Sequence, residues 1–334
     1  MLLVVFAASA IVIAFIGTRM AKIADTLADR TGLGEALIGA VLLGAGTSIS
    51  GIVTSISTAA NGAPELAVSN ALGGIAAQTM FLAIADVSYR KVNLEHAGAS
   101  AINLVQATVL IILVVLPIMA YAAPSVAFFG VHPISPVLVG VYLVGLHNAH
   151  GVKRHPMWQP RQTPHTRSEQ DDEESDARST PLLTGLFAAT VAIVGFAGWI
   201  VGETGLELST RLGISQGVVG VLGTAIVTSL PELVTTIAAV RAGALQLAIG
   251  GIIGGNMFDA LFIAASDVAY RDGSIYHAIS ERSLFWMALV GLMTGVLLIG
   301  LLRREKMGPG GIGWESILLI ALWVGGATLQ FALG

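Results

Sequence analysis

The chain has 334 residues, of which 54% are hydrophobic and 11% are charged, and its mean hydropathy is +0.80. Soluble domains carry about 25% charged residues, so this composition excludes an ordinary soluble enzyme, a disordered chain and a nucleic-acid-binding protein. It indicates an integral membrane protein with many spans. The chain contains no cysteine, which excludes disulfides, thiolate metal sites and thiol catalysis.

Ten apolar segments are interpreted as transmembrane helices, since a helix needs about 20 residues to cross a bilayer. In chain order they cover residues 1–18, 35–60, 66–87, 99–122, 134–147, 182–202, 214–240, 245–269, 283–302 and 314–333. The first segment has no positively charged start and no convincing cleavage site, so it is interpreted as a span and not as a signal peptide.

A polar stretch at residues 148–181 is interpreted as a linker between two repeats, residues 1–147 and 182–334. Fourteen of the 17 Lys and Arg residues fall on the side of the membrane that carries this linker. Because cytoplasmic loops are rich in these residues, the linker is predicted to be cytoplasmic and both termini are predicted to lie outside the cell membrane.

The two halves of the sequence repeat each other. An offset of 181 aligns residues 30–90 with residues 211–271 without a gap and gives 20 identities in 61 positions. Five spans per half is an odd number, so the second copy must enter the membrane from the opposite side. Inverted repeats are typical of secondary transporters, with the binding site at the repeat interface, although channels are built this way too. The predicted fold is therefore all-α, with ten transmembrane helices in two inverted five-helix repeats.

Only two of the 21 acidic residues, Glu232 and Asp259, fall in the middle of a span, and none of the 17 basic residues does. A carboxylate inside a bilayer is costly unless something compensates it. Two such acids without a basic partner are expected to be protonated, to share a proton or to hold a cation, and the alternative is a hydrogen bond between helices. Two further acids near span ends are expected to pair with the arginine four residues later: Asp86 with Arg90 and Asp267 with Arg271.

Oxygen-bearing residues surround the two central acids. Thr228 and Glu232 share a helix face, and Pro231 lacks an N–H, which frees backbone carbonyls near Thr228. Asn256 and Asp259 are three residues apart and supply further oxygens on one face. Carboxylate, hydroxyl and carbonyl oxygens are the ligands that hard cations such as sodium and calcium prefer.

At these residues the chain resembles the calcium/cation antiporter superfamily, specifically its sodium/calcium exchanger-like members. Each of the two inverted repeats in that family carries a G-T-S-x-P-E motif and a later G-S-N-x-x-N/D motif. The second repeat matches at seven positions: Thr228, Ser229, Pro231, Glu232, Gly254, Asn256 and Asp259. Gly255 replaces the serine of the later motif in this repeat.

The first repeat departs from the family pattern. Gly46, Thr47 and Ser48 are present, but the later motif positions differ: Ser50 replaces the proline, Gly51 the acid and Ile75 the asparagine, and Gln78 stands opposite Asp259. The segment from Asn61 to Glu65 reads N-G-A-P-E, but the gapless alignment places it in the loop before the third span, so it is not assigned to the site.

The resemblance implies the sodium/calcium exchanger fold and the exchange of calcium for sodium by alternating access. By position, it implies neutral ligands from the first repeat, at Thr47, Ser48 and Gln78. The remaining ligands come from the second repeat, at Thr228, Ser229, Glu232, Asn256 and Asp259.

The acid lost at Gly51 keeps two alternatives open. The first is an exchanger of the same fold that is coupled to protons or to another monovalent cation, and the second is a cation channel or a non-transporting scaffold. No set of catalytic residues is present in the sequence, so no enzyme activity and no cofactor are expected. The expected partners are membrane lipid and the transported cations, calcium and sodium or protons, with no nucleic acid. The oligomeric state is not predicted.

Overall fold

The structure, a computed structural model, describes residues 1–30, 46–89, 92–154, 157–161, 163, 178–308 and 311–333. Within these ranges the chain is helical, and the strand-like pairing is confined to an isolated bridge between Phe128 and Val131. The predicted all-α class is therefore confirmed.

The described part of the first repeat consists of helices that include both long spans and one short connecting helix. They are α1 (Leu2–Arg30), α3 (Ile49–Ala60), α4 (Pro64–Ser88), α5 (Leu94–Gly98), α6 (Ala101–Ala122) and α7 (Ile134–Arg154). The second repeat begins with the longest helix, α8 (Thr180–Leu212). It continues with α9 (Gln216–Val218), the π-helical turn η1 (Val219–Thr224), α10 (Ala225–Thr228), α11 (Leu230–Ala242), α12 (Leu245–Asp259), α13 (Leu261–Ala269), α14 (Ile275–Ala278), α15 (Glu281–Arg303) and α16 (Trp314–Leu333).

Every predicted span falls on helix in its described part, and residues 35–45 of the second span lie outside the described residues. Seven described helices are long and apolar enough to cross a membrane, and the bent segment from Gln216 to Ala242 makes an eighth. Helices α1, α7 and α8 run past the predicted limits of their spans, because a helix can continue beyond the hydrocarbon layer once polar residues reach water.

The predicted span at residues 214–240 is present as a bent pair of helical segments. This segment contains a π-helical turn and a bend of 48° between α10 and α11. Helices α12 and α13 are likewise separated at Ala260. Interruptions of this kind leave backbone groups without helical partners, and membrane proteins tolerate them where protein surrounds them or a cavity takes them up.

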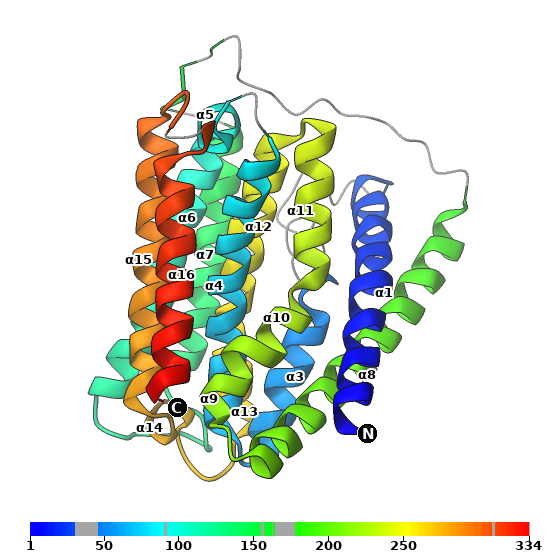
Figure 1. The fold of residues 1–334 in the computed structure, drawn as a ribbon, viewed down its shortest axis with the longest axis vertical. Coiled ribbons are helices and arrows are strands. Elements are labelled where there is room, and N and C mark those ends of the chain that lie inside the picture. Colours follow the sequence, from blue (N-terminus) through cyan, green and yellow to red (C-terminus); the bar gives the residue numbers. More distant parts are fainter. Residues whose placement is uncertain are drawn as a thin grey trace.

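The two repeats run in opposite directions through the molecule. In Figure 1 helix α1 rises from the N-terminus at the bottom, whereas α8 descends from the linker at the top, and both termini lie at the bottom. The turns after α3 and α11 are built alike, at Gly62 with φ +72° and at Gly243 with φ +87°, and these two glycines are separated by the repeat offset of 181. Positive φ favours glycine at both turns.

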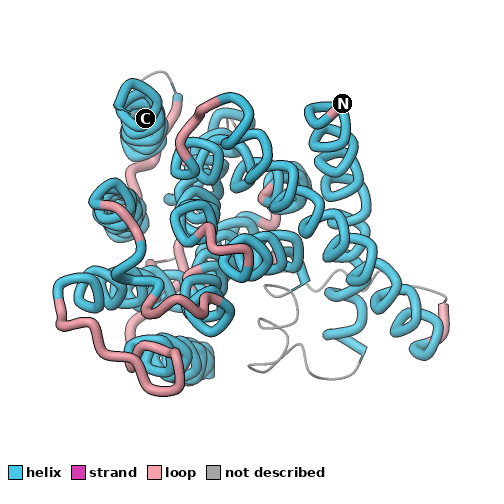
Figure 2. Tube along the Cα trace, turned by 90° about the horizontal axis from the view of Figure 1, so that it is seen from below, coloured by secondary structure: helices cyan, strands magenta, loops and turns pink. Residues whose placement is uncertain are grey.

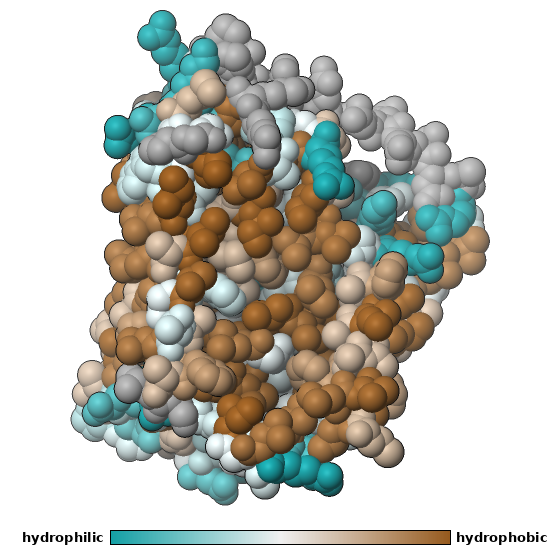
Figure 3. All heavy atoms as spheres, viewed as in Figure 1, coloured by the Kyte–Doolittle hydropathy of each residue, from teal (hydrophilic) through white to brown (hydrophobic). Residues whose placement is uncertain are grey.

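Burial divides the helices into an inner and an outer group. The most apolar window of α4 is 89% buried within the protein, whereas that of α1 is 17% buried and that of α8 is 28% buried. Viewed along the bundle, α1 lies at one margin, apart from the C-terminal helix (Figure 2). The visible surface is hydrophobic between two polar ends (Figure 3), as expected for a multi-pass membrane protein.

The predicted ion pair between Asp267 and Arg271 is not formed. Asp267 is fully buried and accepts hydrogen bonds from the backbone N–H of Ile275 at 3.1 Å, the backbone N–H of His132 at 2.7 Å and the hydroxyl of Ser135 at 2.6 Å. Three donors satisfy a buried carboxylate without a guanidinium. The residue therefore ties two loops to the end of α13.

Candidate cation-binding site

Two interrupted helices meet inside the molecule. In the second repeat the chain breaks at Ser229, between α10 and α11, and in the first repeat it breaks at Ser48, just before α3. The backbone angles at the two breaks agree, with φ −91° and ψ 4° at Ser48 and φ −96° and ψ 6° at Ser229. The same backbone feature is therefore built twice, at positions 181 residues apart.

The first repeat forms its break without a proline. Pro231 lies in the first turn of α11, whereas its counterpart in the first repeat is Ser50. The Ser50 hydroxyl donates to the backbone carbonyl of Thr228 at 3.1 Å, across the repeat interface. The Thr228 carbonyl, in the region where freed carbonyls were expected, therefore already accepts one hydrogen bond from a serine of the other repeat.

Asp259, the last residue of α12, is held by the first repeat. It is 2% exposed, and its two oxygens accept hydrogen bonds at 2.6 Å each, one from the Ser48 hydroxyl and one from the Gln78 side-chain amide. The same Gln78 amide lies 3.3 Å from the Ser229 hydroxyl. Gln78 and Asp259 are counterparts at the repeat offset, as are Ser48 and Ser229, so these contacts cross the interface in a nearly symmetric pattern.

Glu232 differs from Asp259 in having no such support. It lies in the first turn of α11 and is 4% exposed, and neither of its carboxylate oxygens accepts a hydrogen bond with good geometry. The hydroxyl of Thr47 is the polar group beside it. Since buried polar atoms in folded proteins are almost always partnered, two bare carboxylate oxygens indicate a position that a cation or a proton completes.

The two carboxylates line one small, tightly packed cavity that is too narrow to admit a water molecule. Its walls come from both repeats: Ser48, Gly51, Asn70, Gly74, Gln78, Thr228, Ser229, Glu232, Asp259 and Phe262. Among the buried side-chain acceptors here, the oxygens of Asn70 and Gln78 also have no donor. Buried oxygens without donors, beside two carboxylates, form a set of ligands suited to a hard cation.

Position 51 of the first repeat, which lacks the acid, is sterically crowded. A Cβ atom on Gly51 would lie 2.6 Å from the ring of Phe262, which is closer than real Cβ atoms approach a neighbour. The ring of Phe262 therefore fills the space that a side chain at position 51 would need. The cavity is built for two carboxylates, both from the second repeat.

Most of the predicted ligands are brought together. Six line the cavity, namely Ser48, Gln78, Thr228, Ser229, Glu232 and Asp259, and Thr47 does not line it but lies beside Glu232. Asn256 does not line it, because its side-chain amide donates to the Thr79 hydroxyl at 3.0 Å.

Sequence reasoning missed Asn70, which lines the cavity and donates to the backbone carbonyl of Gly51 at 3.1 Å. A signal was present in the sequence. Asn70, Gly74 and Gln78 are spaced four residues apart, so they form one polar and small face on an otherwise apolar span. Glu65, the acid of the N-G-A-P-E segment that was not assigned to the site, lies in the first turn of α4. It is not among the residues that line the cavity.

Comparison with known families agrees with this geometry. The sequence profile of the family described as "Sodium/calcium exchanger protein" matches residues 1–147 and 182–332. The chain belongs to this family. The match therefore covers both repeats and both helix breaks that form the site.

The individual relatives are about 30% identical to this chain, and they align with only part of it. The chain is 32% identical over 121 residues to inner membrane protein YrbG of Escherichia coli, and 30% identical over 146 residues to sodium/calcium exchanger MaX1 of Methanosarcina acetivorans. These alignments cover 36% and 44% of this chain, and only 36% and 37% of the two relatives. The chain thus aligns with well under half the length of each relative.

Solved structures match over almost the whole chain. The sodium-calcium exchanger NCX_Mj superposes with a TM-score of 0.63 at 17% identity, covering 97% of this chain and 96% of that chain. The H⁺/Ca²⁺ exchanger CAX gives a TM-score of 0.68 at 14% identity, covering 99% of this chain and 86% of that chain. The family fold of two inverted repeats is therefore shared at low sequence identity.

Proposed function

We propose that this protein is a secondary active cation antiporter that exchanges calcium for sodium by alternating access. The observation that carries the proposal is Glu232, a buried carboxylate with two unpartnered oxygens in a cavity lined by both inverted repeats. Family membership and the names of relatives, which include a sodium/calcium exchanger and a putative antiporter, support it.

The charge of the site explains how exchange would be coupled. Two carboxylates are neutralised by one calcium ion, two sodium ions or two protons. Because burial of net charge is costly, the cavity favours states in which these cargoes replace one another and disfavours the empty, doubly ionised state. Competition for the same oxygens then links the movement of one cation to the countermovement of another.

Protons are the second candidate for the coupling ion. The observation that favours them is the block at Gly51, where the ring of Phe262 excludes a third carboxylate. Fewer anionic ligands weaken calcium binding and leave a site that two protons satisfy as well as two sodium ions. No enzymatic activity and no resident cofactor form part of either proposal.

The experiment is flux in proteoliposomes that contain the purified protein. Calcium uptake should follow an outward sodium gradient, and uptake that needs a pH gradient but no sodium would support the proton-coupled exchanger. Uptake that is independent of any counter-ion would contradict antiport and indicate a channel.

The site assignment is tested by Glu232→Gln, which removes the unpartnered charge and keeps the side-chain volume. Flux should be lost. The matched control is Glu281→Gln, because Glu281 is an exposed carboxylate at the start of α15. Normal flux in Glu232→Gln would show that the cavity is not the transport site.

We further propose a cell-membrane orientation with both termini outside and the linker in the cytoplasm, based on the distribution of Lys and Arg. The chain has no cysteine, so a single cysteine placed at exposed Met157 in the linker or at Met1 can be labelled by an impermeant thiol reagent. In intact cells only the terminal cysteine should react.

A further inference from the structure

The end of the molecule that carries the linker contains a second set of buried acids, separate from the cation site. Asp86, near the end of α4, accepts hydrogen bonds from the backbone N–H of Leu94 at 2.8 Å, the backbone N–H of Gly313 at 3.0 Å and the hydroxyl of Ser316 at 2.9 Å. Each donor is the counterpart, 181 residues away, of a donor to Asp267. Arg90, which was expected to pair with Asp86, lies outside the described residues.

Asp86 and Asp267, which each accept three hydrogen bonds, have neighbours of different chemistry. At the end of the molecule that carries Asp267, the hydroxyl of Tyr276 shares a hydrogen bond of 2.8 Å with Ser135, and the adjacent residue is Ile134. The counterparts of Tyr276 and Ile134 near Asp86 are Glu95 and Glu315. A neutral pair at one end of the molecule is therefore replaced by two carboxyl groups at the other end.

Both glutamates are buried and unpartnered. Glu95 and Glu315 are each 1% exposed, and none of their four carboxylate oxygens makes a hydrogen bond. They converge on Asp86 at one point beside Gly313. An atom at the Cβ position of Gly313 would lie 2.8 Å from Oε2 of Glu315, 3.3 Å from Oε2 of Glu95 and 3.5 Å from Oδ2 of Asp86.

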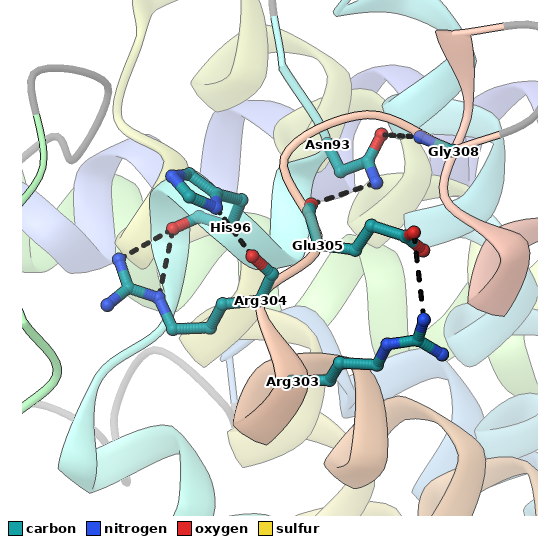
Figure 4. A network of polar contacts seen from close by, with 6 residues as sticks. All are labelled: Asn93, His96, Arg303, Arg304, Glu305 and Gly308. Atoms are coloured by element: carbon teal, nitrogen blue, oxygen red, sulfur yellow. Dashed lines mark hydrogen bonds and ion pairs between the residues drawn. The ribbon is translucent and has the colours of Figure 1, made fainter.

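Three basic residues at this end of the molecule, His96, Arg303 and Arg304, have polar partners outside this cluster (Figure 4). The Arg304 guanidinium donates to the backbone carbonyl of His96, and the His96 ring contacts the Arg304 carbonyl and the Thr163 hydroxyl. The Arg303 guanidinium, which is exposed, lies 3.7 Å from the carboxylate of Glu305. These contacts leave the three buried carboxyl groups facing one another.

Three carboxyl groups in one buried space cannot all carry charge without a large energetic cost. Asp86 accepts hydrogen bonds from three donors. Glu95 has none, and burial together with the nearby charge of Asp86 raises the pKa of Glu95 to about 8. Within the described residues no group of three or more acids or histidines has the geometry to hold a metal ion.

We propose that Asp86, Glu95 and Glu315 form a proton-binding site that is distinct from the transport site. The bound proton lets α5 and the first turn of α16 pack against the end of α4. Loss of the proton at alkaline pH places adjacent buried charges in this junction and loosens it. The proposal does not depend on which ions the protein transports.

The test measures proton binding and stability, not transport. All proteins carry Glu232→Gln and Asp259→Asn, so that the two acids at the cation site do not contribute to the titration. Thermal unfolding of the purified protein in lipid nanodiscs, followed by intrinsic fluorescence, is compared for this background and for the same background with Glu95→Gln and Glu315→Gln. Glutamine mimics the protonated acid in shape and charge.

The sign of the pH effect follows from the raised pKa. The folded state holds a proton that the unfolded state releases between the ordinary pKa of a glutamate, 4.5, and about 8. The Tm of the background should therefore fall as the pH rises through this window. With both glutamates replaced, this fall should disappear, so the variant should match the background at acidic pH and exceed it by several degrees at alkaline pH.

Two further measurements make the outcome decisive. Infrared spectra at neutral pH should show a protonated carboxyl band that is absent when both glutamates are replaced, and Glu281→Gln should leave both the band and the pH profile unchanged. If the double replacement does not fold, each single replacement provides the same comparison. A pH profile parallel to that of the background, an unchanged carboxyl band, or stabilisation by calcium or sodium that requires Glu95 would overturn the proposal.

Discussion

The two repeats contribute to the cation site in different ways. The second repeat supplies both carboxylates, Glu232 and Asp259, whereas the first repeat supplies Ser48 and Gln78, which donate to Asp259. The helix breaks at Ser48 and Ser229 are nonetheless the same in backbone geometry. Both repeats therefore share the same backbone break, but only the second repeat carries carboxylates at the cation site.

This division gives the two acids different tasks. Asp259 is fixed by hydrogen bonds from the first repeat, so it joins the two halves as well as contributing charge. Glu232 accepts no such bonds and is available to a cargo ion. The first half therefore acts mainly through positioning, and the second half mainly through charge. Changes that move charge from one repeat to the other should break or restore the site in a predictable order.

The largest effect is expected from exchanging the acid and the amide across the interface. Asp259→Gln should reduce calcium flux by about a hundred-fold, because it removes a carboxylate ligand, a loss of about 3 kcal/mol. Adding Gln78→Asp should restore a substantial part of the flux. In the double variant the Ser229 hydroxyl, already 3.3 Å from the side chain at position 78, can take the role of Ser48. Flux in proteoliposomes measures both variants.

The control for this exchange is the single variant with the new acid at position 78 and Asp259 unchanged. Gln78→Asp alone places a third carboxylate beside Asp259 and removes a donor, so its flux should differ from that of the double variant. If the double variant were as inactive as Asp259→Gln, the two positions would not be interchangeable. The near-symmetry of the contacts would then have no functional counterpart.

A smaller effect, an increase in calcium affinity, is expected from placing an acid at position 51 of the first repeat. Gly51→Glu alone should lower the Tm, because its Cβ would lie 2.6 Å from the buried ring of Phe262. Gly51→Glu combined with Phe262→Ala provides space for the carboxylate and should raise calcium affinity by about ten-fold, since ligand charge tunes calcium binding. Binding is measured by calorimetry. The control is Phe262→Ala alone, and equal affinities in these two proteins would contradict a shared site.

Much of this fold follows from the sequence for simple physical reasons. A helix inside a bilayer must satisfy its own backbone, so apolar segments of sufficient length identify the spans. The offset of 181 then relates the two halves without further information. The central acids Glu232 and Asp259 stand out because charge within a span is costly, and the structure places both at one cavity.

The remaining features depend on contacts between distant segments. Asp267 precedes Arg271 by one helical turn, yet its carboxylate accepts from His132, which is 135 residues away. Asn256 precedes Asp259 by three residues, which leaves about 60° between their directions on a helix. That angle is enough to turn Asn256 toward Thr79 on α4. Local spacing predicts a shared face, but it does not determine which neighbour each side chain meets.

The smallest effect is expected at Pro231, the residue that distinguishes the two helix breaks. Because the first repeat breaks in the same geometry with a serine at this position, Pro231→Ala should keep the break and place Glu232 as before. The ring of Pro231 packs closely on Gly17 of α1, where an added Cβ would lie 2.5 Å from Cγ. Its loss should cost about 1 kcal/mol of stability and change flux by less than about three-fold. Flux as low as in Glu232→Gln would instead show that the second break depends on its proline.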